Sequence, residues 1–188
     1  FDFRFKDFKL RARIPLRGMR QVENASLAIA AVHLLDKKYA VKGIDYKKGL
    51  KETYLEGRFE TALKEPLIIL DIAHNVSSFR ALNQSIKDYF PKKKIILIFG
   101  ASKDKNVKQM LSVIDYDRII ITSFGNPRAL DPHRIKEFCN KTAVLEPSVE
   151  KALKKALSYY NKGCLILVSG SFFLAAEAKE AIKKIAPC

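Results

Sequence analysis

Three polar side chains that could do chemistry, Asp71, His74 and Asn75, follow a short apolar run at 67–70. The run is too short for a helix and is bounded by turn residues, so it predicts a buried strand. In open α/β sheets, ligands bind at the carboxyl edge of the strands, where a carboxylate, an imidazole and an amide would meet them. The alternative is that Asn75 caps the next helix and Asp71 closes a turn, because residues of these types commonly do so.

Two further turns consist of small residues, Gly100-Ala101-Ser102 and Ser169-Gly170-Ser171. Each follows a predicted strand and precedes a predicted helix, and small residues let a backbone approach an anionic ligand at a helix N-terminus. The sequence contains neither the dinucleotide-binding fingerprint nor a Gly-x-x-x-x-Gly-Lys-Ser/Thr phosphate loop. We therefore expect the chain to have no phosphate-gripping loop of its own.

The elements that must position these residues alternate regularly from residue 58 onward. We predict strands at 58–63, 67–71, 95–99, 118–122, 142–145 and 164–168, and helices at about 77–90, 104–114, 132–140, 148–160 and 171–185. Continuous apolar strands are typical of parallel sheets buried on both faces. The alternation predicts a doubly wound α/β fold with a mostly parallel six-stranded sheet. Only about three residues, 64–66, join the first two strands, so their pairing is antiparallel, because a parallel crossover needs a dozen or more.

Residues 1–56 follow a different pattern. Alternation over 2–15 predicts an antiparallel hairpin, and a helix is predicted from Asn24 to Leu35 with one apolar face formed by Ala25, Leu27, Ala28, Ala31, Val32 and Leu35. A second, short helix is predicted from Ile44 to Leu55. These elements lack a second complete layer, so we expect residues 1–56 to be the tail of one domain and residues 57–188 to form another.

The charge is strongly positive, since 35 Lys and Arg residues face 20 Asp and Glu residues, a formal net charge of +15. Such a balance raises the question of nucleic acid. The lysines, however, are dispersed as pairs and triplets, RNA-binding signatures are absent and there is no tryptophan. We expect a solvated lysine-rich surface that suits anionic small substrates, and no specific nucleic-acid partner.

Three cysteines, Cys139, Cys164 and Cys188, are widely spaced and predict neither a metal site nor a disulfide framework. They suit a reducing cytoplasm. No apolar run is long enough to span a bilayer, so we expect no membrane partner. The chain starts without methionine and without a signal peptide, which we interpret as a start inside a longer protein.

Five segments resemble the Mur ligase superfamily, and within it the folylpolyglutamate synthase/dihydrofolate synthase family. They are Gly57-Arg58-Phe59-Glu60 followed by Asp71-Ile72-Ala73-His74-Asn75, the segment 99–106, Arg128-Ala129-Leu130, the segment 169–177, and 16–25 upstream. The sequence departs from the family pattern in Ile72, where glycine is usual, in Val76, where proline is usual, and in Arg20, where histidine is common.

The resemblance implies an ATP-dependent amide ligase. In such enzymes a carboxylate takes the γ-phosphoryl group of ATP, and an amine, glutamate in the folate enzymes, attacks the acyl phosphate; the protein positions reactants and neutralises phosphoryl charge. Residues 1–56 would be the remnant of the central ATPase domain. Most Mg²⁺ ligands would lie outside this chain, and no metal ligand is assigned within it.

Carried over residue by residue, the resemblance implies that ATP is contacted by Asn24, Arg58, Asp71, His74 and Asn75, and that Asp71 and His74 are catalytic. Ser77 and Ser78 are weaker candidates for substrate contacts. Two alternatives remain open: Arg58 as a structural salt bridge to Asp71 or Glu60, and His74 as a turn residue.

We interpret the chain as the C-terminal part of a cytoplasmic, monomeric ligase whose substrates are ATP, L-glutamate and folate or dihydropteroate. We expect this part to be inactive alone. The alternatives are a Mur-superfamily ligase that acts on a peptidoglycan precursor, and a non-catalytic basic nucleotide-binding module.

Overall fold

A computed structural model of the chain describes residues 1–41, 43–139 and 142–185. It divides into two compact units, an N-terminal unit at Phe1–Glu56 and a C-terminal unit at Gly57–Cys188. Each unit has its own elements and its own packing, and the C-terminal unit contains the predicted site at 71–75.

The N-terminal unit consists of a hairpin and two helices. Strands β1 (Asp2–Phe5) and β2 (Phe8–Arg11) pair antiparallel, as the alternating pattern predicted. Helix α1 (Met19–Tyr39) follows, and α2 (Tyr46–Lys51) is a short helix. Helix α1 is longer than predicted at both ends. Helix α2 begins later than predicted because Asp45 caps its first turn by accepting a hydrogen bond from Lys48 N, and it ends at Lys51 instead of 55.

The apolar face predicted for α1 is not the side of the helix that the N-terminal unit buries. The residues that α1 buries are Gln21, Ile29 and His33, whereas Leu27 and Leu35 of the predicted face are 71% and 51% exposed. The physical reason is that α1 is apolar on more than one side, and the pattern alone does not say which side a thin hairpin covers. His33 stacks on Phe8 with ring centroids 4.4 Å apart, so this histidine belongs to the packing of the unit.

The C-terminal unit is built on one six-stranded sheet in the order β3-β4-β8-β5-β6-β7. Its strands are β3 (Glu60–Lys64), β4 (Leu67–Leu70), β5 (Lys94–Phe99), β6 (Arg118–Ile121), β7 (Ala143–Leu145) and β8 (Cys164–Ser169). Only the β3–β4 pair at the edge is antiparallel, and all other pairs are parallel. The predicted doubly wound sheet with one antiparallel edge strand is therefore confirmed.

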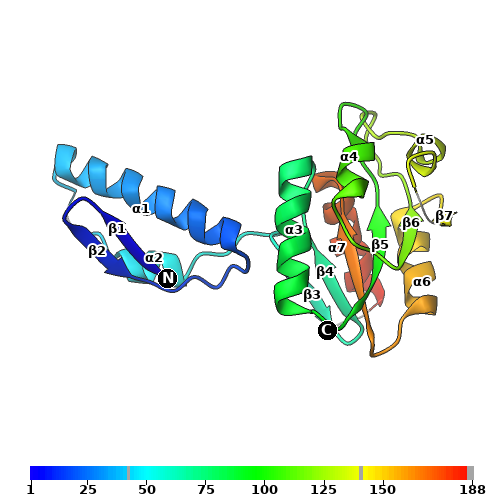
Figure 1. Ribbon diagram of the computed structural model, residues 1–188, viewed down its shortest axis with the longest axis horizontal. Helices are drawn as coiled ribbons and strands as arrows, with labels where there is room; N and C mark the ends of the chain where they lie inside the picture. The colour runs from blue at the N-terminus through cyan, green and yellow to red at the C-terminus, as the bar shows by residue number, and fades with distance from the viewer. Residues whose placement is uncertain (42, 140–141, 186–188) are drawn as a thin grey trace. The chain divides into compact units, whose positions relative to one another are not determined.

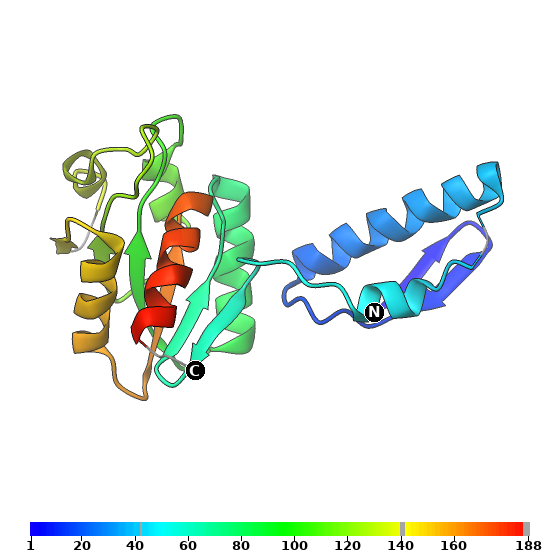
Figure 2. The ribbon, with the colours of Figure 1, turned by 180° about the vertical axis from the view of Figure 1, so that it is seen from behind.

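Helices cover both faces of this sheet. On one face lie α3 (Val76–Tyr89), α4 (Val107–Ser112) and α5 (Pro132–Lys136), of which α3 and α4 stand before the sheet in Figure 1. On the other lie α6 (Val149–Tyr159) and α7 (Phe172–Ile185), which come to the front in Figure 2. Successive strand residues alternate between the two cores: Leu165 and Leu167 enter the first, and Ile166 and Val168 the second.

Two helices are shorter than predicted. Helix α4 begins at Val107 instead of 104, because the Asn106 side chain accepts a hydrogen bond from Gln109 N and caps it there. Helix α5 ends at Lys136 instead of 140, and residue 140 lies outside the described residues. The loop between the small-residue turn at 100–102 and the start of α4 is therefore longer than predicted.

Candidate functional site

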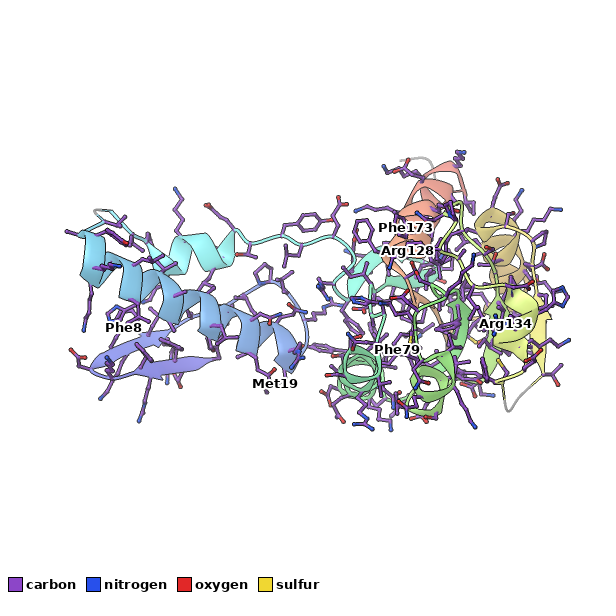
Figure 3. The ribbon with its side chains drawn as sticks, turned by 90° about the horizontal axis from the view of Figure 1, so that it is seen from above. Phe8, Met19, Phe79, Arg128, Arg134 and Phe173 are labelled. Atoms are coloured by element: carbon purple, nitrogen blue, oxygen red, sulfur yellow. The ribbon has the colours of Figure 1, made fainter. Side chains whose placement is uncertain are left out.

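The predicted site lies where neighbouring connections leave the sheet toward opposite faces. Strands β4 and β5 lead into α3 and α4 on one face, while β8, which lies between them, leads into α7 on the other. Figure 3 looks onto the sheet from above and labels Phe79 of α3 and Phe173 of α7 on its two sides. Such a switch point is where doubly wound sheets bind ligands.

The loops after β4, β8 and β5 touch one another at this edge. Asp71 N donates to Val168 O at 3.0 Å, and Gly170 N donates to Ala73 O at 3.1 Å. Gly170 has φ +121°, and a Cβ added there would come within 2.5 Å of Gly100 O. Glycine is therefore required at 170, because a side chain would force the β8 and β5 loops apart.

The Asp71 carboxylate is occupied by the backbone around it. Its Oδ2 accepts a hydrogen bond from Phe59 N at 2.9 Å, and its Oδ1 accepts one from Ala73 N at 2.8 Å. Burial raises the pKa of the Asp71 carboxyl to about 6, although the two backbone hydrogen bonds and the nearby charges of Arg58 and His74 lower it. Both hydrogen bonds of the Asp71 carboxylate are to backbone N–H groups, as expected if Asp71 closes a turn.

His74, Asn75 and Ser78 form the start of helix α3. Asn75 Oδ1 accepts from Ser78 N at 2.8 Å, and Ser78 Oγ accepts from Asn75 N at 3.1 Å, which together make a capping box. His74 is exposed; its Nδ1 lies 3.0 Å from Ile72 O, and its backbone N donates to Ser78 Oγ. The contacts of Asn75 are thus those of a helix cap, as the alternative for this residue predicted. The imidazole of His74 is exposed to solvent, and its Nδ1 is the ring nitrogen that lies near Ile72 O. Ser77 is exposed beside them.

Arg58 sits between two backbone positions in the left-handed region, Gly57 at φ +65° and Phe59 at φ +50°. Among the described residues the Arg58 guanidinium has no ion pair, so neither salt-bridge alternative for this residue is formed. Glu60 is instead paired with Lys179, Nζ to Oε1 at 2.8 Å. The sheet edge therefore brings together Arg58, Asp71 and the 74–78 turn.

Asn24 belongs to the N-terminal unit. It lies on α1, is exposed, and its Nδ2 donates to Gln21 Oε1 at 3.3 Å. The other six predicted site residues belong to the C-terminal unit, within the segments 58 and 71–78.

Sequence reasoning missed the residues that hold the loops. Glu60 and Lys179 are far apart in sequence, and so are Gly125 and Glu177, whose Oε1 accepts from Gly125 N at 2.6 Å. No spacing rule links such pairs. The ring of Phe173 also stacks on that of Phe124, with centroids 5.8 Å apart.

The loop after β6 is joined to the loop after β5. Lys103 N donates to Arg128 O at 2.9 Å, Leu130 N donates to Ala101 O at 2.8 Å, and Arg128 lies 3.6 Å from Asp104. The segments around Gly100 and Arg128, noted separately in the sequence, are thus one structural feature.

Two pockets occur at the opposite edge of the sheet. One, of about 510 Å³, is lined by residues that include Phe90, Lys93 and Asp117, and the other, of about 670 Å³, by residues that include Lys94, Arg118 and Tyr159. Within the part of the chain that the structure describes, no three His, Cys, Asp or Glu side chains group as metal ligands. No helix there combines the length and apolar character that a membrane crossing requires.

Known proteins similar to this chain include folate enzymes. The dihydrofolate synthase/folylpolyglutamate synthase of Buchnera aphidicola is 28% identical over 185 residues, which are 96% of this chain and 43% of that protein. The UDP-N-acetylmuramoyl-L-alanyl-D-glutamate–2,6-diaminopimelate ligase of Wolinella succinogenes is 30% identical over 166 residues, 82% of this chain and 37% of that one. The chain spans less than half the length of these relatives.

Among solved structures, the bifunctional folylpolyglutamate synthase/dihydrofolate synthase of Yersinia pestis, complexed with AMPPNP and a Mn ion, superposes with a TM-score of 0.82. The match covers 95% of this chain and 43% of that one, at 24% identity, which shows a shared fold. The family described as "Mur ligase, glutamate ligase domain" matches residues 57–172, which is more than half of the chain and contains Arg58, Asp71 and His74. This protein therefore belongs to the Mur ligase family and carries its glutamate ligase domain.

Proposed function

We propose that this chain is the C-terminal part of an ATP-dependent carboxylate–amine ligase that adds glutamate to folate or dihydropteroate. The observation that carries the proposal is the matched glutamate ligase domain at 57–172, whose Arg58, Asp71 and His74 meet at the switch point of the sheet. Likeness to the Buchnera folate enzyme over nearly the whole chain supports folate as the acceptor. Residues 1–56 would be the end of the central ATPase domain.

In this proposal the reaction proceeds through an acyl phosphate. The acceptor carboxylate attacks the γ-phosphorus of ATP and ADP leaves; the glutamate amine then attacks the acyl carbon and expels phosphate. In this proposal the phosphate loop and most of the Mg²⁺ ligands belong to the part of the longer protein that lies outside this chain. The chain's own contribution is to bind and orient ATP and glutamate.

Arg58 and Ser78 are half-buried and His74, Asn75 and Ser77 are exposed, so their side chains are available for ligand contact. Arg58 offers a planar cationic fork that suits a phosphate, and it has no ion pair among the described residues. The accessible imidazole edge of His74 faces solvent at the same turn. Asn75, Ser77 and Ser78 are weaker contacts to ATP or substrate, because Asn75 and Ser78 already cap α3. Asn24 would reach the adenine from the N-terminal unit.

The second candidate is a Mur-family ligase that acts on a peptidoglycan precursor. The 30% identity to the Wolinella diaminopimelate ligase supports this second candidate. Both candidates share the nucleotide chemistry and differ in acceptor and amine, so substrate competition separates them: folate with glutamate against a muramoyl dipeptide with diaminopimelate.

The experiment is ligation of radiolabelled glutamate to folate by the longer protein that contains this chain and by the 188-residue chain alone. We expect turnover only from the longer protein, because the chain has no phosphate loop. Turnover by the 188-residue chain would contradict the proposal that it is a partial enzyme.

His74→Ala in the longer protein should lower kcat/KM by 100-fold or more while the melting temperature changes little, because the exposed ring contributes little packing. His133→Ala is the matched control, since His133 is also an exposed histidine at the start of a helix. If His74→Ala mainly lowers the melting temperature, His74 is a turn residue.

A further inference from the structure

A pocket of about 670 Å³ lies at the edge of the sheet where the parallel strands begin. In Figure 2 the arrow of β5 points upward, so the strands start at the lower end of the sheet, and the loop at 71–78 follows β4 at the upper end. The volume is within the range of pockets that hold small molecules. The side chains that line it are mostly polar or charged, among them Lys94, Asp117, Arg118 and Asn161. Such a lining suits a polar ligand.

Lys94 and Arg118 stand at the starts of neighbouring strands and project from the same face. In the parallel β5–β6 pair Arg118 lies opposite Ile96. Lys94 comes two residues before Ile96, so all three side chains point to one face of the sheet. This is the face that α6 and α7 cover, because Ile96 belongs to its core. Two positive charges on one face of adjacent strands repel each other.

Tyr159, in the last turn of α6, is contacted by two cations. Arg118 Cζ lies 4.6 Å and Lys155 Nζ 5.1 Å from the centre of its ring, which is the range of cation–π contacts. The two charges are therefore within about 10 Å of each other, a separation at which charges still interact at 0.1 M salt. Among the described residues the side chains of Lys94, Arg118 and Lys155 form no hydrogen bond and no ion pair. The pocket thus gathers positive charge that no acidic side chain pairs with.

The negative groups at this pocket do not balance the three cations. Of the residues that line it, Asp117 is acidic, and its Oδ2 already accepts a hydrogen bond from Ile95 N at 2.7 Å. The C-terminus of α6 adds about half a negative charge, so the cations exceed the anions by about one and a half charges. A phosphomonoester carries about −1.5 to −2 near pH 7 and matches this excess, whereas a carboxylate carries a single charge.

The backbone around the pocket is held by hydrogen bonds. Lys94 N donates to Gly163 O at 2.9 Å, and Cys164 N donates to Asn161 O at 2.8 Å. Asn161 Oδ1 also accepts from Gly163 N at 2.9 Å. The loop before β8 is thereby tied to the start of β5. A site whose backbone is already ordered loses little conformational entropy when a ligand binds.

We propose that this pocket binds a phosphate group of a small polar molecule through Arg118, Lys94 and Lys155. The Tyr159 ring supports the Arg118 guanidinium, whose N–H groups are free for a bidentate contact with phosphate oxygens. The two lysines supply further point charges. The site does not rest on the proposed function, because its residues lie at the starts of β5 and β6, whereas residues 71–78 lie beyond the end of β4.

The experiment is an NMR titration of the nitrogen-15-labelled 188-residue chain with inorganic phosphate, at an ionic strength kept constant with chloride. The variants Arg118→Gln and Lys94→Gln test the site. Arg134→Gln is the matched control, because Arg134 is an exposed arginine of α5 that also has no ion pair among the described residues. A parallel titration with succinate distinguishes phosphate from carboxylate.

We expect saturable shifts of the amide signals of Arg118 and of residues 161–164. Arg118→Gln should weaken phosphate binding about tenfold or more, because it removes a charge-assisted contact. Lys94→Gln should weaken it about threefold, because an exposed ammonium contributes less, and Arg134→Gln should leave the affinity unchanged. Succinate should bind about tenfold more weakly than phosphate or worse, because its two charges are on separate carboxylates.

The proposal is overturned if the shifts do not saturate, if Arg118→Gln binds phosphate as tightly as the wild type, or if succinate binds equally well. Shifts confined to residues 71–78 would overturn it too, because phosphate would then bind at the other edge of the sheet. Arg118 and Lys94 are exposed, so both variants should fold, and Lys155→Gln replaces either variant that does not.

Discussion

The two units of this chain bury their apolar residues to very different extents. In the C-terminal unit helices cover both faces of the sheet, and strands β5 and β8 are buried almost throughout. In the N-terminal unit the buried hydrophobic residues are Phe3, Ala12 and Ile29, while α1 exposes Met19 and Leu27. Secondary structure therefore forms in both units, but only the C-terminal unit, whose sheet is covered by helices on both faces, has a large hydrophobic core.

The largest effect should come from separating the units. We expect residues 57–188 to unfold cooperatively as an isolated domain and residues 1–56 to be largely unfolded alone, because so short a chain with so few buried apolar side chains cannot offset its conformational entropy. Circular dichroism and thermal melts of the two pieces check this. A cooperative thermal transition of residues 1–56 would contradict the conclusion that the N-terminal unit has too small a core to fold alone.

A smaller effect should come from one leucine in each unit. Leu167→Ala, at 0% exposure in β8, should lower the free energy of unfolding by about 2–5 kcal/mol, because it leaves a cavity between packed layers. Leu27→Ala, at 71% exposure on α1, should change it by less than about 0.5 kcal/mol. Urea titration of the 188-residue chain measures both, and equal effects would show that α1 is covered in solution.

The smallest expected effect concerns two carboxyl groups. Burial raises the pKa of Asp71 to about 6, whereas the hydrogen bond and charge of Arg11 lower that of the exposed Asp2. Since the folded pKa of Asp71 lies above its unfolded value, its contribution to stability is full below pH 4 and is lost as the pH rises through 6. At roughly 1.4 kcal/mol per pKa unit, the loss is about 2–3 kcal/mol.

Carbon-13 NMR of the carboxyl groups tests this prediction. Asp71 should titrate with a midpoint near 6 and Asp2 below 3.8, and Asp71→Asn should remove the corresponding part of the pH dependence of unfolding. An Asp71 midpoint near 3.8 would show that its carboxyl is solvated in the folded protein.

The fold of the C-terminal unit was predictable from sequence because its signals are local and redundant. The continuous apolar run at 164–168 is typical of a strand buried on both faces. The connection at 64–66 is too short for a parallel crossover, so it predicts an antiparallel pair. Helix α1 was not predictable to the same depth, because Leu27 and Ile29 are equally apolar and only the hairpin decides which is buried.

The location of the candidate site could be predicted from the sequence, but the contacts of its side chains could not. A polar cluster after a buried strand indicates the sheet edge, so Asp71 and His74 were found together. The occupation of both Asp71 oxygens depends on the left-handed Phe59, and the partner of Glu60 is Lys179 on the last helix. Contacts between residues so distant in sequence have no local pattern.

The order of strands has a consequence for synthesis. Strand β8 is the last to be made, yet it lies between β4 and β5 and forms all the hydrogen bonds that join the two halves of the sheet. Until residues 164–169 have left the ribosome, β4 and β5 each present an unpaired parallel edge, the kind of edge that recruits foreign strands. Fast folding or a chaperone would protect these two edges during the interval between the synthesis of β5 and that of β8.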